Sequence, residues 1–126
     1  MPKKEKVLIV DDDHFNLDIL SRYLGAANFE VLQADDGDAA LQKLTGAPDI
    51  AVIVLDLEMP RLHGMALLKK IKIMPALKDI QVIVQTVVDN RKWKTTPGLE
   101  DIYGYLTKPY DPEILIDLIH KALQKP

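Results

Sequence analysis

Acidic residues follow two apolar runs of the sequence, and a threonine and a lysine follow two others. The run at residues 7–10 is followed by Asp11 and Asp12, and the run at residues 50–55 is followed by Asp56. Thr86 follows residues 81–85, and Lys108 follows residues 102–107. Short apolar runs that end at turn residues are typical of strands buried in a parallel sheet. Because ligands of open α/β sheets bind beyond the carboxyl ends of the strands, we expect these side chains to meet there.

Three carboxylates in one place would repel one another unless a cation lay between them. Mg²⁺ is the hard cation that carboxylate and phosphate oxygens bind, and it keeps several of its waters. Lys108 would add a positive charge and Thr86 a hydroxyl donor, and both groups stabilise an oxyanion. Taken singly, each residue is ordinary for a cap or a turn. Together they favour phosphoryl transfer onto Asp56, which would give an aspartyl phosphate.

Helices are expected between the strands to hold these strand ends in position. The spacing of apolar residues and the capping residues predict helices at residues 14–25, 39–44 and 64–72 and from residue 111 onward. A further strand is expected at residues 29–34. This alternation predicts an α/β fold, a doubly wound parallel sheet of five strands with helices on both faces. Pro97 and Gly98 would end any helix before the fifth strand early, so we expect a shortened or irregular fourth helix.

Composition limits the class of protein. The 126 residues are expected to form one domain, because no linker, repeat or low-complexity segment is present. A net charge of −3 is unlike the basic surface of a nucleic-acid binder, so no nucleic-acid binding is expected. The absence of cysteine excludes disulfides and thiolate metal sites. No apolar run is long enough for a membrane span and no signal-peptide pattern is present, so we expect no membrane contact and a cytoplasmic location.

The motifs resemble those of the receiver domain of two-component response regulators, over the whole chain. The matching segments are Val-Asp-Asp-Asp at 10–13, Leu-Asp-Leu-Glu-Met-Pro at 55–60 with Gly64, Thr86, and Tyr-Leu-Thr-Lys-Pro at 105–109. The spacings of 44 residues from Asp12 to Asp56, 30 from there to Thr86 and 22 to Lys108 also resemble those of short receivers. The resemblance implies the flavodoxin-like strand order 2-1-3-4-5, of which receivers are one example.

By this resemblance, Asp56 is the phosphoacceptor and part of a Mg²⁺ site. Asp12 and Asp56 would bind the ion through their carboxylates. Asp11 would bind mainly through water, and Glu58 through its backbone carbonyl. Lys108 would pair with the phosphoryl group or, before phosphorylation, with Asp56.

The resemblance also implies a switch and its partners. Thr86 would bond a phosphoryl oxygen and Tyr105 would swing inward behind it, which couples the site to the face of the fourth helix, fifth strand and fifth helix (the 4-5-5 face). A histidine kinase or phosphotransfer protein would supply the phosphoryl group, and a downstream target protein or an attached output domain would respond. The chain would catalyse only its own phosphorylation and dephosphorylation, and a homodimer is left open. The Lys108–Pro109 bond is expected to be cis.

Several residues depart from the family pattern. Val87 stands where a small residue is usual and could narrow the path of a phosphodonor, or it could point into the neighbouring loop. His63 is expected to be an exposed polar residue rather than a metal ligand. Pro97 and Gly98 affect the 4-5-5 face more than the phosphorylation site. Trp93 is interpreted as a partly exposed contact residue, with local core as the alternative.

Two other functions remain open on the sequence. A Mg²⁺-dependent phosphohydrolase with an aspartyl nucleophile would carry an Asp-x-Asp motif on the first strand and a cap domain, for which this chain has no room. A phosphorylation-independent interaction module with the receiver fold would fit Val87 and the broken fourth helix. Intact mass after incubation with Mg²⁺ and a small phosphodonor separates the switch from this module.

Overall fold

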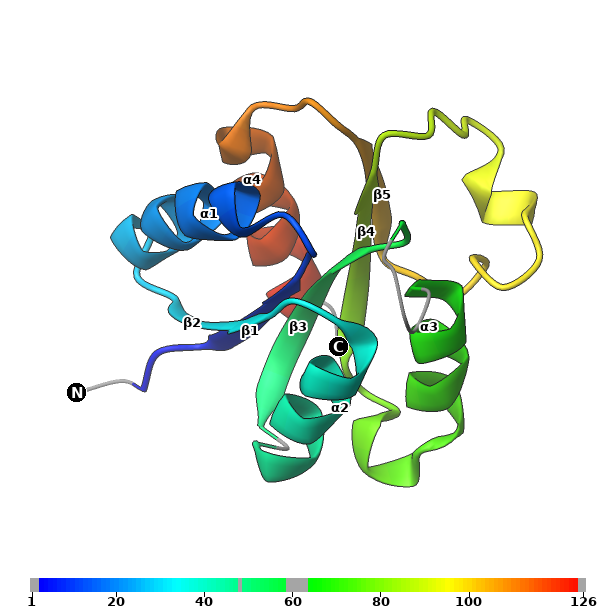
Figure 1. Cartoon of the computed structure of the whole chain (residues 1–126), viewed down its shortest axis with the longest axis horizontal. Coiled ribbons are helices and arrows are strands. Elements are labelled where there is room, and N and C mark those ends of the chain that lie inside the picture. The colour runs from blue at the N-terminus through cyan, green and yellow to red at the C-terminus, as the bar shows by residue number, and fades with distance from the viewer. Residues whose placement is uncertain (1–2, 48, 59–63, 125–126) are drawn as a thin grey trace.

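Five parallel strands form one sheet with helices on both faces (Figure 1). The computed structural model describes residues 3–47, 49–58 and 64–124. The strands pair in the order β2-β1-β3-β4-β5, which is the order that the resemblance to receiver domains implies. Their bounds are β1 (Lys6–Val10), β2 (Glu30–Ala34), β3 (Ile50–Asp56), β4 (Gln81–Thr86) and β5 (Gly104–Thr107).

Two pairs of helices cover the two faces of the sheet (Figure 1). The helices α1 (His14–Ala26) and α4 (Pro112–Leu123) pack on one face, and α2 (Gly37–Gly46) and α3 (Gly64–Ile73) on the other. Asp13 caps α1 as expected, accepting hydrogen bonds from the N–H groups of Phe15 (3.0 Å) and Asn16 (3.3 Å). Asp111 caps α4, and Pro112 follows at its first turn. The caps therefore fix where both helices of this face begin.

The central strands are buried on both faces, which explains their continuous apolar runs. Residues 7–10 of β1 and 52–55 of β3 have no exposed surface. Along β4, Ile83 packs in the cluster under α1 and α4, whereas Val84 packs in the cluster under α2 and α3. By this alternation, the Gln85 side chain lies on the α1/α4 face and the Thr86 side chain on the α2/α3 face. Asp56 and Thr86 are the last residues of β3 and β4, so they lie at the same edge of the sheet.

The segment at residues 87–103 joins β4 to β5 without an α-helix, and the structure describes all of it. Its only helical part is the 3₁₀ turn η2 (Trp93–Thr95). Pro97 and Gly98 end it as predicted, and Gly98 takes a positive φ of 91° that favours glycine. Lys72 on α3 links the segment to that helix by donating a hydrogen bond to the Gly98 carbonyl oxygen (3.1 Å).

Several element ends differ from the sequence-based expectation by one or two residues. The strand β5 begins at Gly104 rather than at Ile102, because the Ile102 N–H still donates to Leu99 O in the preceding turn (3.4 Å). The helix α3 extends to Ile73 and is followed by the 3₁₀ turn η1 (Pro75–Leu77). None of the helices in the described ranges is long and apolar enough to cross a membrane.

Candidate functional site

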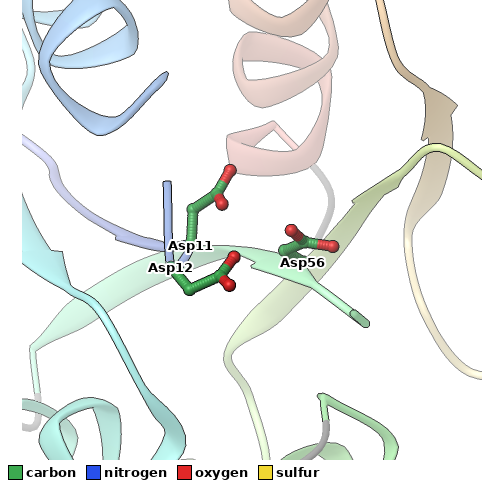
Figure 2. Close-up of side chains that lie close together, drawn as sticks. All are labelled: Asp11, Asp12 and Asp56. Carbon is green, nitrogen blue, oxygen red and sulfur yellow. The ribbon is translucent and has the colours of Figure 1, made fainter. Parts of the chain in front are cut away.

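Three carboxylates gather at the carboxyl ends of β1 and β3 (Figure 2). Asp11 and Asp12 follow β1, Asp56 ends β3, and one oxygen of each lies within 4.8 Å of the others. Asp11 has no exposed surface and Asp56 is 5% exposed, whereas Asp12 is exposed. Hard oxygen donors so close together fit Mg²⁺, which binds through one or two carboxylates and keeps several waters. The donors therefore match the ion that the sequence predicts.

Lys108 lies between two of these carboxylates. Its Nζ is 2.8 Å from Asp11 Oδ2 and 3.1 Å from Asp56 Oδ2. Burial alone would lower the pKa of Lys108, but the hydrogen bonds and charges of Asp11 and Asp56 outweigh burial and raise it. The ammonium is thus a fixed positive charge beside Asp56. The Lys108–Pro109 bond that follows is cis, as expected.

Both oxygens of Asp11 are taken up by hydrogen bonds. Oδ1 accepts from the Asp13 N–H (3.0 Å), and Oδ2 accepts from Lys108 and from Asn16 Nδ2 (2.6 Å). The side chain of Gln85 also donates to Oδ2, at 3.4 Å. Burial opposes the charged form, but these donors outweigh it and lower the pKa of the Asp11 carboxyl. Asp11 is therefore an ionised, fully hydrogen-bonded carboxylate.

Asp56 is less well compensated than Asp11. It accepts hydrogen bonds from the Glu58 N–H (3.0 Å) and from Lys108. Burial raises the pKa of the Asp56 carboxyl, and the negative charge of Asp11 adds to this, so the two donors do not restore the ordinary value. The negative charge of Asp56 is consequently destabilised even with Lys108 beside it, and a divalent cation at the carboxylate would stabilise it.

Thr86 and Tyr105 both bond to Val88, just beyond the end of β4. The Thr86 side chain, 1% exposed, accepts from the Val88 N–H (3.4 Å). The Tyr105 hydroxyl donates to the Val88 carbonyl oxygen, and its ring stacks on Trp93 with centroids 6.2 Å apart. Trp93 is thus half-buried, and it both packs against the core cluster and reaches the surface. A pocket of about 670 Å³ opens here between α3 and the segment at 87–103.

Of the remaining expected residues, Glu58 and Val87 are described by the structure. The Val87 side chain is 68% exposed, and the Glu58 side chain is exposed beside Asp56. His63 lies outside the described residues, as do Met59 and Pro60. The structure thus brings together Asp11, Asp12, Asp56 and Lys108, with Thr86 on the neighbouring strand.

Three polar residues of the site were missed by the sequence reasoning: Asn16, Gln85 and Tyr110. Asn16 and Gln85 donate to Asp11, and the Tyr110 hydroxyl donates to Gln85 Oε1 (2.5 Å). Gln85 carried a usable signal, because it is an amide at the end of an otherwise apolar strand pattern. Asn16 and Tyr110 carried none, since a polar residue in a first helical turn and a tyrosine in a loop are ordinary.

Comparison with known proteins gives one consistent result. The family model described as "Response regulator receiver domain" matches residues 7–120. The chain is 29% identical to chemotaxis protein CheY1 of Helicobacter pylori, over 94% of this chain and 96% of that protein. It is 32% identical to two-component response regulator ORR5 of Oryza sativa subsp. japonica, over 94% and 88%.

The fold also matches solved structures. A putative response regulator from Chloroflexus aurantiacus superposes with a TM-score of 0.87 at 29% identity, over 98% of this chain and 100% of that one. Sequence similarity and fold therefore agree over nearly the whole chain.

Proposed function

The chain belongs to the response regulator receiver domain family, and we propose that it acts as a phosphorylation-controlled switch of two-component signalling, with Asp56 as phosphoacceptor. The observation that carries this proposal is the position of the Asp56 carboxylate. It lies 3.1 Å from the Lys108 ammonium and within a cluster of three acids. A nearly buried carboxylate with a positive charge on one side and a cation-binding group on the other suits nucleophilic attack on phosphorus.

The residues that would hold Mg²⁺ follow from their free lone pairs. Asp12 is exposed and Asp56 carries only two donors, so both have oxygens available for direct coordination. Asp11 is surrounded by four donors, so it would reach the ion through a water. The Glu58 backbone carbonyl is proposed as a further ligand. When bound, the ion would neutralise charge on the transferring phosphoryl group.

The proposed chemistry is the transfer of a phosphoryl group from a phosphohistidine. A carboxylate oxygen of Asp56 forms the new P–O bond while the P–N bond to the donor imidazole breaks. Lys108 stabilises the negative charge on the phosphoryl oxygens and keeps its proton throughout. Hydrolysis of the resulting aspartyl phosphate releases inorganic phosphate and restores Asp56, so the chain turns over no external substrate beyond this cycle.

The proposed response passes through Val88. A phosphoryl oxygen accepting from the Thr86 hydroxyl would draw Thr86 toward Asp56 and weaken its bond with the Val88 N–H, 3.4 Å long here. Because Tyr105 donates to the carbonyl oxygen of the same residue, its ring and the stacked Trp93 would move with it. The 4-5-5 face of this chain consists of the segment at 87–103, β5 and α4. A target protein or attached output domain would recognise its altered surface.

Intact-mass spectrometry tests the proposal. Incubation with Mg²⁺ and phosphoramidate is expected to add one phosphoryl group to the protein, and Asp56→Asn is expected to abolish the gain. Asp79→Asn is the matched control, because Asp79 is an exposed acid just before β4, at the opposite end of that strand. No mass gain, with Mg²⁺ binding demonstrated, would favour the phosphorylation-independent interaction module, which the irregular segment at 87–103 also fits.

A further inference from the structure

A largely buried series of hydrogen-bonded polar side chains lies on the α1/α4 face of the sheet, beneath the acid cluster. Gln85 has no exposed surface, and its amide reaches Asp11 at one end and Tyr110 at the other. Tyr110 follows the cis proline in the loop that leads into α4. This series of hydrogen bonds therefore runs from the loop before α4, through Gln85 on β4, to Asp11 at the end of β1.

The charge of Asp11 determines which group donates and which accepts in each of these hydrogen bonds. An ionised carboxylate only accepts hydrogen bonds, so the end of the Gln85 amide that faces Asp11 must be the NH₂ group. Its carbonyl oxygen then faces Tyr110 and accepts the hydroxyl proton. Burial raises the pKa of the Tyr110 phenol, and the charges of Asp11 and Asp56 add to this, so the phenol stays neutral and able to donate.

Without Tyr110, the 3.4 Å hydrogen bond to Asp11 would be the one side-chain contact among the described residues that orients the Gln85 amide. A flipped amide would present its carbonyl oxygen to Asp11 Oδ2, and two acceptors would then repel each other. Asp11 Oδ2 is also the atom that Lys108 contacts at 2.8 Å. A rotation of this carboxylate would therefore move the ammonium group beside Asp56 as well.

We propose that Gln85 and Tyr110 are positioning residues of the cation site: Tyr110 orients the Gln85 amide, and this amide holds the Asp11 carboxylate in the rotation that serves the ion. This inference rests on the proposed function, because it assigns these two residues to the same Mg²⁺ site. Groups that orient the ligands of a metal commonly change its affinity on the order of tenfold or more when removed.

The test is Mg²⁺ titration of the unphosphorylated protein, followed by the backbone amide NMR signals of residues 11–13 and 56–58. Tyr110→Phe removes one hydroxyl and is expected to raise the Mg²⁺ dissociation constant on the order of tenfold. Gln85→Met, which keeps the length of the side chain, is expected to raise it by a similar factor. Tyr23→Phe is the matched control, because Tyr23 is 45% exposed on α1, and it is expected to bind Mg²⁺ as the wild type does.

The double variant tests whether Tyr110 acts through Gln85. In the Gln85→Met background, Tyr110→Phe is expected to cause no further change, because the amide that it orients is gone. A loss that multiplies the two single losses would overturn the coupling. A lowered melting temperature with an unchanged dissociation constant for Tyr110→Phe would show a purely structural role and overturn the proposal.

Phosphorylation rates separate this inference from the proposed function. With phosphoramidate, the Tyr110→Phe protein is expected to react slowly at low Mg²⁺ and to recover to within about twofold of the wild-type rate at saturating Mg²⁺. Failure of the wild type to take up phosphate would refute the proposed function alone, because the titration needs no phosphate. Failure of the wild type to bind Mg²⁺ would refute both.

Discussion

The end of β4 is buried on both faces of the sheet, but it is fully hydrogen-bonded on one face and borders a pocket on the other. On the α1/α4 face, Gln85 has no exposed surface and both ends of its amide are hydrogen-bonded. On the α3 face, Thr86 and Tyr105 each hydrogen-bond to Val88, beside a pocket of about 670 Å³ and an irregular segment of chain. Adjacent residues of one strand thus have very different surroundings.

This difference fits the two tasks that the proposed phosphorylation-controlled switch would have. The acids and Lys108 must keep one geometry, and densely packed, fully hydrogen-bonded groups provide it. A surface that changes on phosphorylation must instead have a second arrangement of similar free energy, and regions with few buried contacts supply it. We therefore expect perturbations on the α1/α4 face to reduce global stability, and perturbations at residues 87–103 to act locally.

The largest effect is expected at Lys108, the residue bonded to Asp11 and Asp56. Lys108→Ala would leave two buried carboxylates without their cation and cost about 3 kcal/mol of unfolding free energy at neutral pH. Added Mg²⁺ should restore part of the loss, because it replaces the missing positive charge. Urea unfolding with and without Mg²⁺ measures both, and Lys70→Ala on the exposed side of α3 is the control. Equal losses for the two variants would contradict the electrostatic account.

A matched pair of leucines compares the two faces directly. Leu115 on α4 is fully buried, and Leu115→Ala is expected to cost about 3 kcal/mol of unfolding free energy. Leu99 in the irregular segment is also nearly buried, at 3% exposed, but it lines the open pocket, into which its neighbours can relax. Leu99→Ala is therefore expected to cost about half as much. Urea unfolding gives both values, and a Leu99→Ala loss equal to that of Leu115→Ala would remove the contrast.

A smaller effect on stability, in the stabilising direction, is expected when Asp56 is replaced by asparagine. The pKa of Asp56 is raised in the folded protein, so its ionisation destabilises the fold once the pH exceeds the unfolded-state value of about 4. Asp56→Asn without Mg²⁺ should then raise the melting temperature by a few degrees at pH 7. The gain should vanish as the pH falls below about 4, because both folded and unfolded carboxyls are then neutral. Thermal unfolding from pH 3 to pH 8 measures it, and a gain independent of pH would contradict this origin.

The smallest effect is expected at Val87. Its side chain is 68% exposed, so Val87→Ala should change the unfolding free energy by less than about 0.5 kcal/mol. The phosphorylation rate with phosphoramidate should stay within about twofold of wild type, because an exposed side chain can rotate away from a small donor. A large acceleration would show instead that Val87 obstructs the path to Asp56.

The sequence predicted those parts of the fold and site that depend on local signals. Continuous apolar runs predicted the strands, and the acids and the lysine at their ends predicted the cluster, because parallel strands bring their carboxyl ends to one edge. The structure at 87–103 was predicted only as an irregularity. Pro97 and Gly98 exclude a long helix, but the path taken instead depends on tertiary contacts such as those of Lys72 and Trp93.

The hydrogen bonds that Gln85 makes beneath the acid cluster could not be predicted from local signals. The contact between Gln85 and Tyr110 joins residues 25 positions apart, and Gln85 lies 74 positions from Asp11. Nothing in the spacing of these residues marks them as partners. The tertiary fold, which places the loop before α4 beside the end of β4, brings the phenol to the amide.

The central claim is that one divalent cation lies between Asp12 and Asp56, with Lys108 next to Asp56. Crystals grown with Mn²⁺ in place of Mg²⁺ test this most directly, since anomalous scattering locates the metal. We expect a single peak in direct contact with carboxylate oxygens of Asp12 and Asp56 and with the Glu58 carbonyl oxygen. Absence of a peak at Asp12 and Asp56, at a Mn²⁺ concentration that saturates binding in solution, would contradict the account.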